Sequence, residues 1–348
     1  MPVTRSEVAQ QAGVSPAVVS YVINGGPRPV AAPTRARVEA AIEALGYRPN
    51  ALAGAFRRGR TKTIGVLIPS PLNPFYAELA QVIENELLLH GYLMSMGIST
   101  FNAEQDSLYL QSFSDRRMDG VIVAANASLP RTRTGAADIP QVILDDASPQ
   151  PSAAVFTDNH ADALRAVDHL QGHGHRIIGC IACPPTWTSG NRRVRAWRDQ
   201  QRRAGLPSDE GLVAYADSSE TGGASALRTL LSADSYRHSR HPVRPTAIFV
   251  STDVQAFGVL RACSELGVRV PDDLAVVSFD GTHRARYTQP RLTTMRQPLH
   301  EIVTTAVSML LNRIADHHDD MSSVDHLALK GNLVIGETCG CGSMTADG

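Results

Sequence analysis

The sequence has few cysteines and no long apolar run. Five cysteines in 348 residues are too few for a disulfide framework, and neither of the two close cysteine pairs has a second pair at zinc-finger spacing. Apolar runs such as 64–68 and 121–125 fall far short of the roughly 18 to 20 residues of a membrane span. The first ten residues contain no apolar signal core. We therefore expect a cytoplasmic protein with structural thiols.

The chain also has little net charge, but its charge is unevenly distributed. The formal net charge is −1, from 33 basic and 34 acidic residues. Residues 1–62 hold nine basic and three acidic residues, a net charge of +6, so the other 286 carry 24 basic and 31 acidic residues, or −7. A basic segment joined to an acidic body indicates an anionic partner for the first sixty residues only.

Local signals in the basic segment predict a helix-turn-helix. Thr4 and Glu7 form a capping box at the start of one helix, which ends at Gly13. Ser15 caps a second helix, and Pro16 fits its first position. A third helix over 34–45 is long enough to close a three-helix core. Although any αα-hairpin could show part of this pattern, the positive charge favours DNA as the partner.

These residues resemble the DNA-binding head of the lactose-repressor/galactose-repressor (LacI/GalR) transcription factors. The matching segments are 3–4, 8–15, 19–24, 34–38 and 45–51. In that family the two residues after the Ser15 equivalent, and the one after the Ser20 equivalent, contact base edges. Here these residues are Pro16, Ala17 and Tyr21. Pro16 and Ala17 offer only apolar contacts, so direct readout is expected from Tyr21 and Ser20.

The resemblance extends to a hinge helix that folds when two copies meet in the minor groove. Phe56 stands where the family inserts a leucine between base pairs, and Ala53 matches a usual hinge alanine. The alternative is a plain linker. Together the head and hinge supply these expected DNA-binding residues: Thr4, Ser15, Pro16, Ala17, Ser20, Tyr21, Asn24, Asn50, Ala53, Phe56 and Arg57.

From residue 63 onward, short apolar runs alternate with helical patterns, which predicts parallel α/β layers. The expected strands are 64–68, 93–98, 121–125, 141–144, 177–182, 212–215, 247–250 and 275–279. The expected helices are 75–90, 103–116, 161–171, 193–204, 222–231 and 254–265. Two similar lobes are implied, and ligands of such sheets bind at the carboxyl ends of the strands, here between the lobes.

Acidic residues stand at three of these strand ends. Asp145, Asp253 and Asp280 each lie just after an apolar run, and carboxylates there suit a ligand with many hydroxyl groups. Arg193 could donate hydrogen bonds in return. The segment 73–76 is expected to begin a helix beside the crevice, with free N–H groups and an aromatic wall. Each Asp could instead be a helix cap or the partner of a structural ion pair.

The body is also similar to the effector-binding and dimerisation body of the LacI/GalR family, whose fold resembles periplasmic sugar-binding proteins. The matching segments include 65–69, 119–122, 174–179, 245–249, 267–273 and 292–298. Carrying the family's positions over implies an effector site at Phe75, Asp145, Arg193, Thr252 or Asp253, and Asp280, with Trp187 and Ser189 ahead of the arginine. Tyr76 joins these candidates as part of the aromatic wall. The Arg- and His-rich segment 232–243 looks longer than the family norm.

A metal site and an enzyme are the weaker interpretations. His169, His173 and His175 suggest metal binding, but His175 belongs to a turn usual in the family, and no cysteine or acidic cluster completes a site. The chain has no nucleophile elbow, phosphate-binding loop or HExxH motif. We therefore expect no metal, no cofactor and no catalytic residues.

The sequence predicts an all-α helix-turn-helix head on a two-lobed, periplasmic-binding-protein-like α/β body with parallel sheets. The expected domains are 1–48 (head), 49–62 (hinge helix and linker) and 63–348 (body), with lobes of approximately 63–160 plus 291–320, and 161–290 plus 321–348. The expected function is a dimeric, ligand-responsive regulator, most simply a repressor, of a near-palindromic double-stranded DNA operator. The effector is expected to be a sugar, or alternatively a purine. A soluble sugar-binding protein and a metabolic enzyme are the rival classes.

Overall fold

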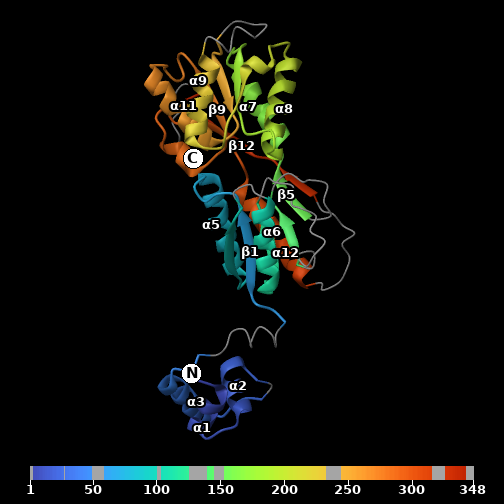
Figure 1. Cartoon of the computed structure of the whole chain (residues 1–348), viewed down its shortest axis with the longest axis vertical. Coiled ribbons are helices and arrows are strands. Elements are labelled where there is room, and N and C mark those ends of the chain that lie inside the picture. Colours follow the sequence, from blue (N-terminus) through green and yellow to red (C-terminus); the bar gives the residue numbers. More distant parts are fainter. Residues whose placement is uncertain are drawn as a thin grey trace. The chain divides into compact units, whose positions relative to one another are not determined.

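A computed structural model describes residues 3–26, 28–48, 59–99, 103–124, 139–144, 153–232, 244–315 and 326–341. The chain divides into two compact units, Met1–Thr61 and Lys62–Gly348. The described residues of the first unit form three helices. Those of the second form two sheets with helices on their faces (Figure 1).

The helices of the first unit are α1 (Arg5–Ala12), α2 (Pro16–Asn24) and α3 (Ala32–Leu45). Thr4 caps α1: its backbone N–H donates to the Glu7 carboxylate over 2.6 Å, while its hydroxyl accepts from the Glu7 N–H over 3.3 Å. The Ser15 hydroxyl caps α2 by accepting from the Val18 N–H over 3.4 Å. Both caps confirm the expected helix starts. The third helix begins two residues earlier than expected, because Pro33 fits the first turn.

Apolar faces of the three helices enclose a small core. Val8, Val19 and Val38, one from each helix, are completely buried and pack together. Gly46 ends α3 with a φ of 60°, a left-handed conformation that glycine adopts at no steric cost. The head therefore folds around its own core, with the amino-terminal end of α2 left exposed.

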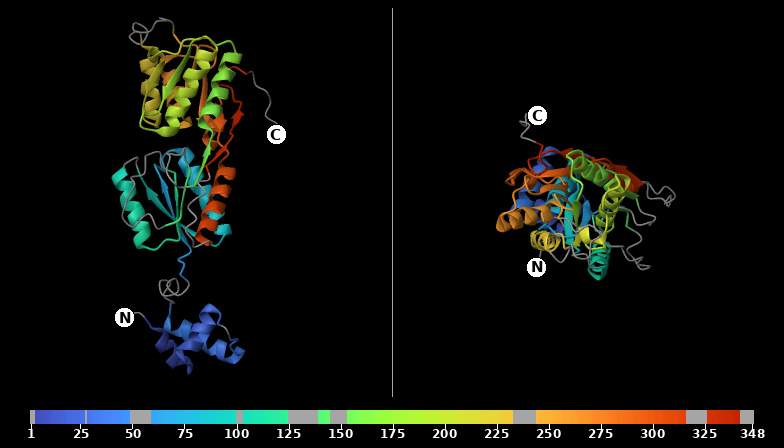
Figure 2. Two further views of the ribbon diagram at one scale, coloured as in Figure 1. Left: turned by 90° about the vertical axis from the view of Figure 1, so that its right-hand side faces the viewer. Right: turned by 90° about the horizontal axis from the view of Figure 1, so that it is seen from above.

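The first lobe of the larger unit is built on a parallel six-stranded sheet of order β11-β5-β4-β3-β1-β2. Its strands are β1 (Thr63–Ile68), β2 (Leu93–Ile98), β3 (Gly120–Val123), β4 (Gln141–Ile143), β5 (Ala153–Thr157) and β11 (His326–Leu329). Helices α5 (Pro74–Leu89) and α12 (Leu299–Ala315) cover one face, and α6 (Ala103–Asp115) covers the other (Figure 2).

The second lobe has a sheet of order β12-β10-β9-β8-β6-β7, parallel except for β12, which runs antiparallel to β10. Its strands are β6 (Ile178–Ala182), β7 (Val213–Tyr215), β8 (Ala247–Val250), β9 (Ala275–Asp280), β10 (Thr293–Arg296) and β12 (Asn332–Val334). One face carries α7 (Asn159–Gly172) and α8 (Thr188–Arg203), and the other carries α9 (Glu220–Leu231) and α11 (Asp253–Leu266). The short helices η2 (Glu210–Leu212) and η3 (His283–Tyr287) lie in connections.

The chain passes between the lobes three times, from β5 to α7, from β10 to α12 and from β11 to β12. This differs from the expected lobes, which placed 291–320 in the first and 321–348 in the second. Instead, β10 pairs with β9 in the second sheet, and β11 pairs with β5 in the first. β11 is an edge strand of the first sheet and β10 lies between β9 and β12 in the second, and local sequence pattern does not show which sheet a short strand joins. Among the described helices, none combines the length and apolarity needed to cross a bilayer.

Candidate functional site

A crevice lies between the two lobes, at the carboxyl ends of strands from both sheets. Its empty volume, including the open space at its mouth, is about 580 Å³. Residues from both lobes and from two crossings line it: Asn73, Phe75, Tyr76, Leu79, Leu144, Leu299 and Ile302; Cys183, Trp187, Ser189, Gly190, Arg193, Thr252 and Asp280; and Thr157 and Gln297. A ligand in the crevice would therefore touch both lobes.

The first lobe supplies an apolar wall at the start of α5. Phe75 and Tyr76 pack edge to face, with their ring centroids 5.2 Å apart. The Asn73 side-chain oxygen accepts from the Phe75 N–H over 3.0 Å, and the Asn73 carbonyl accepts from the Tyr76 N–H over 3.1 Å. The expectation of free N–H groups here was therefore wrong, because the Asn73 turn uses them. The expected aromatic wall is present.

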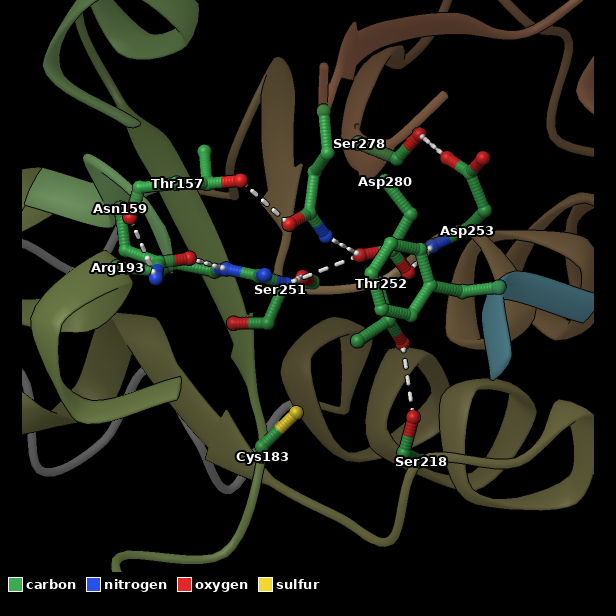
Figure 3. A network of polar contacts seen from close by, with 12 residues as sticks. Thr157, Asn159, Cys183, Arg193, Ser218, Ser251, Thr252, Asp253, Ser278 and Asp280 are labelled. Atoms are coloured by element: carbon green, nitrogen blue, oxygen red, sulfur yellow. Dashed lines mark hydrogen bonds and ion pairs between the residues drawn. The ribbon is translucent and has the colours of Figure 1, made fainter. Parts of the chain in front are cut away.

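The second lobe presents a buried arginine, Arg193, on the first turns of α8. Its guanidinium lies over the Phe279 ring at 3.8 Å and donates to the Asn159 side chain over 2.8 Å and to the Ser251 carbonyl over 2.6 Å. It also contacts the Asp280 carboxylate over 3.3 Å (Figure 3). These contacts come from three separate segments, so the guanidinium is held in one orientation before any ligand arrives.

Asp280 ends β9 with a φ of 123°, which an L-residue rarely adopts and which turns its carboxylate toward the crevice. The carboxylate accepts from Arg193, from the Gln297 amide over 2.9 Å and from the Asp253 N–H over 3.3 Å. Burial raises the pKa of Asp280 to about 7, although the Arg193 guanidinium lowers it. This acid can therefore be neutral or charged near neutral pH, and a ligand that donates to it would favour the charged form.

Gln297 connects Asp280 to the first crossing. The Thr157 hydroxyl donates to the Gln297 carbonyl oxygen over 2.7 Å, and the Gln297 amide group donates to Asp280. Thr157 ends β5 just before one crossing, and Gln297 follows β10 at the next, so this chain of hydrogen bonds joins two connections between the lobes (Figure 3). A movement of the Asp280 side chain would therefore act on both connections between the lobes.

Asp253 does not line the crevice, which corrects its assignment as an effector residue. It is completely buried, and its carboxylate accepts from the hydroxyls of Ser278 (2.6 Å), Thr294 (2.7 Å) and Thr282 (2.8 Å), and from the Thr282 N–H. These hydrogen bonds to the Asp253 carboxylate hold the strand ends in place below the crevice. Its neighbour Thr252, the cap of α11, does line the crevice.

The structure brings together seven of the nine expected effector residues: Phe75, Tyr76, Trp187, Ser189, Arg193, Thr252 and Asp280. Asp145 lies outside the described residues. Sequence reasoning missed Thr157, Cys183 and Gln297. Cys183 follows β6, an expected strand, so the rule applied to the acids would have found it if the rule had included other polar residues. Thr157 ends β5 and Gln297 follows β10, and neither strand was expected from the sequence.

In the head, the exposed surface of α2 differs in part from the expected one. Pro16 and Ala17 are exposed and Tyr21 is half-buried, whereas Ser20 is buried, and the Asn24 amide donates to its carbonyl over 3.0 Å. Ser20 therefore faces the head's interior rather than a base. A Cβ at Gly26 would lie 2.3 Å from the Tyr21 ring, so glycine at this position leaves room for the ring. Of the other expected residues, Thr4 and Ser15 are exposed helix caps.

Four expected DNA-binding residues, Asn50, Ala53, Phe56 and Arg57, lie outside the described residues, as does the segment 233–243.

Comparison with known proteins gives matches over nearly the whole chain. The family "Bacterial regulatory proteins, lacI family" matches residues 4–50, and "Periplasmic binding protein-like domain" matches residues 167–339. The HTH-type transcriptional repressor PurR of Photorhabdus laumondii is 34% identical over 331 residues, covering 92% of this chain and 93% of that protein. PurR of Edwardsiella ictaluri is 33% identical over 330 residues, with the same coverage. The chain belongs to the LacI family.

Solved structures of transcriptional regulators confirm the fold. The lac repressor dimer bound to operator and the anti-inducer ONPF superposes with a TM-score of 0.85 at 25% identity, covering 97% of this chain and 99% of that one. A complex of the transcriptional regulator CelR with cellobiose gives a TM-score of 0.70 at 28% identity, with the same coverage. The predicted family, helix-turn-helix head and two-lobed parallel body are thus confirmed. As a LacI-family member the chain is a DNA-binding transcriptional regulator rather than an enzyme.

Proposed function

We propose that this protein is a repressor that binds a near-palindromic operator as a homodimer, and that a small molecule in the crevice sets its affinity for DNA. The observation that carries the proposal is the buried Arg193–Asp280 pair, which faces a crevice lined by both lobes in a chain that also has a helix-turn-helix head. The PurR relatives are named transcriptional repressors, which supports repression rather than activation.

On this proposal α2 is the recognition helix in the major groove. Pro16 and Ala17 make apolar contacts, for example with a thymine methyl group, and Tyr21 supplies the polar contact to a base edge. Thr4, Ser15 and Asn24 lie nearby and contribute contacts to the phosphate backbone. The buried Ser20 acts by positioning Asn24.

The hinge proposal is based on sequence alone. Two copies of the segment 49–58 fold as helices in the minor groove at the centre of the operator, where Phe56 inserts between base pairs and Asn50, Ala53 and Arg57 pack along the groove. Replacing Phe56 by alanine should then weaken specific binding far more than non-specific binding. Equal losses in both would refute its role.

Dimerisation is supported by exposed apolar side chains on the first lobe. β2 is one of the two edge strands of the first sheet, and its Leu93 and Met96 are 64% and 44% exposed. Leu89, at the end of α5, and Leu72, just before that helix, are more than three-quarters exposed. A monomer that leaves an apolar edge strand uncovered risks aggregation, whereas a second copy would cover it. The dimeric lac repressor structure has the same fold.

The crevice favours a sugar as the effector. Asp280, Thr157 and Thr252 accept or donate hydrogen bonds to hydroxyl groups, Arg193 donates, and the aromatic rings of Trp187 and Phe75 can stack on a sugar ring. The cellobiose complex of CelR supports this choice. A purine is the second candidate, because the PurR relatives suggest it and the same aromatic rings would stack on a flat base.

Effector binding would act by changing how the lobes close. The lobes already touch where the His283 N–H donates to the Glu78 carboxylate over 2.8 Å and the Asn73 amide donates to the Ser218 hydroxyl over 3.5 Å. A ligand that contacts Phe75 on one lobe and Arg193 on the other stabilises one degree of closure over another. If closure alters whether two hinge segments can pair, effector and operator affinities are coupled reciprocally.

Selection of bound sequences from a random duplex pool tests the proposal. Full-length protein is used alone and with panels of sugars and of purines. Enrichment of a palindrome, weakened or strengthened by a compound from one panel, would support the proposal and identify the effector class. Enrichment without a palindrome would contradict the dimer, and no enrichment under any condition would contradict the operator-binding role.

A further inference from the structure

Four side chains with metal-binding atoms meet at the end of α7 in the second lobe. His169 lies in the last turn of α7 and His173 directly follows the helix, while Cys339 and Cys341 come from the segment after β12. One imidazole nitrogen or sulfur from each residue lies within 4.8 Å of all the others. The His173 Nε2 atom is 3.0 Å, and the His169 Nε2 atom 3.6 Å, from the Cys341 sulfur.

This arrangement could not be read from sequence spacing. No metal was expected, because no cysteine stands near these histidines along the chain. His173 and Cys341 are 168 residues apart in sequence, and the fold of the second lobe brings them together. The site is also remote from the crevice, because the 14-residue helix α7 begins at Asn159, which holds Arg193, and extends about 20 Å at 1.5 Å per residue.

The geometry of both segments suits chelation. His169 and His173 are four residues apart, so their side chains lie on the same side of the helix, with ring centroids 4.8 Å apart. Gly340 separates the two cysteines with a φ of 86°, a conformation that other residues rarely adopt. Its turn lets both sulfurs approach the same pair of imidazoles.

The donor set identifies the class of metal. Two thiols and two imidazoles are a typical ligand set of structural zinc, whereas calcium and magnesium prefer oxygen ligands. Zn–S bonds of about 2.3 Å and Zn–N bonds of about 2.0 Å place ligand atoms roughly 3.3–3.8 Å from one another. Small side-chain rotations would bring the four atoms from 4.8 Å or less to these separations.

We propose that His169, His173, Cys339 and Cys341 bind one zinc ion, which fastens the C-terminal segment to the end of α7. This segment is already part of the frame of the second lobe: the Thr338 hydroxyl donates to the Val276 carbonyl over 2.7 Å and accepts from the Thr293 N–H over 2.9 Å. A bound ion would therefore clamp β9 and β10, whose ends position Asp280 and Gln297. The ion would stabilise the folded protein as any ligand of the native state does.

Metal titration of the full-length, reduced protein tests the proposal. We expect it to take up one Co²⁺ per chain, with sulfur-to-cobalt charge-transfer absorption and the intense visible bands of a tetrahedral site, and we expect Zn²⁺ to displace the cobalt. Zn²⁺ should also raise the melting temperature. Octahedral cobalt without the charge-transfer band, or uptake well below one ion per chain, would overturn the proposal.

Variants of the two more exposed ligands separate metal binding from folding. His173→Ala and Cys341→Ser leave the buried Cys339 in place, and circular dichroism checks that both fold. Each should lose more zinc affinity than the roughly 10- to 100-fold that removal of an outer-shell partner costs. His175→Ala is the matched control, because the His175 ring contacts the Thr246 hydroxyl instead, over 2.9 Å. If both ligand variants bind zinc as tightly as wild type, the site does not exist.

Discussion

Replacing Arg193 by methionine tests whether Asp280 is a buried acid that titrates near neutral pH. Methionine keeps much of the apolar length of the side chain but removes the guanidinium and its bonds to Asn159, Ser251 and Asp280. Removing one partner of a buried ion pair typically costs about 3–5 kcal/mol of unfolding free energy, because the other charge stays buried. For Arg193→Met, this loss of unfolding free energy should depend on pH.

The sign of the pH dependence follows from the pKa of Asp280, which burial raises to about 7. An unfolded aspartate titrates near pH 3.9, so the folded state holds the proton more tightly. The stability that this carboxyl contributes is full below about pH 4 and is lost as the pH rises through about 7. Without the guanidinium the folded pKa rises by a further one to two units, roughly. The penalty of Arg193→Met should then be about 1–2 kcal/mol larger near pH 8.5 than near pH 6.

Urea unfolding at the two pH values, followed by circular dichroism, measures this difference. Arg195→Met is the matched control on the same helix, because the Arg195 side chain is 79% exposed and reaches Asp199 only over 3.9 Å. It should cost less than about 1 kcal/mol at both pH values. An Arg193→Met penalty that is the same at both pH values would show that Asp280 does not titrate in this range, and the electrostatic account of the crevice would fail.

Three further predictions concern the head and the packing of the second lobe. Tyr21→Ala should cost about 1–3 kcal/mol of sequence discrimination at one base position per half-site. An unchanged base preference in the selected sequences would mean that Tyr21 does not contact a base edge. Operator affinity should fall roughly 10³- to 10⁵-fold between about 50 and 200 mM salt if some 6 to 10 phosphates are neutralised. An affinity that does not change with salt would refute phosphate binding by the basic head. Gly258→Ala should destabilise the protein by about 1–3 kcal/mol in urea unfolding, because its Cβ would lie 1.8 Å from the Glu220 carbonyl oxygen where α11 meets α9. Gly172→Ala, which meets no atom within 4 Å, is its control, and equal losses would refute the packing argument.

Features set by neighbouring residues could be predicted from the sequence. The caps at Thr4 and Ser15 and the stop at Gly46 depend on contacts within a few residues, so the pattern was sufficient to place the head helices. The main strands of both sheets also follow from apolar runs. β5 (Ala153–Thr157) could not be predicted, because a five-residue strand that begins with two alanines carries little β-propensity.

Features set by distant residues could not be predicted. Asp253 and Asp280 each follow an apolar run in the sequence, yet only Asp280 faces the crevice. The difference arises because Ser278 and Thr294, 25 and 41 residues from Asp253, turn its carboxylate inward. The strand-end rule therefore located the crevice correctly but not every side chain in it.

The three passages between the lobes have a consequence for how the protein is made. Until residues 299–329 have left the ribosome, the first sheet has no edge strand β11. The face of that sheet that α12 covers is also open until then. By then nearly all of the second lobe has been synthesised. The first lobe must therefore wait, with apolar surface open to chaperones and to neighbouring nascent chains, while the second is completed. The head has its own core and can fold long before the rest of the chain. A prematurely terminated chain would therefore keep the DNA-binding head and lose the effector site.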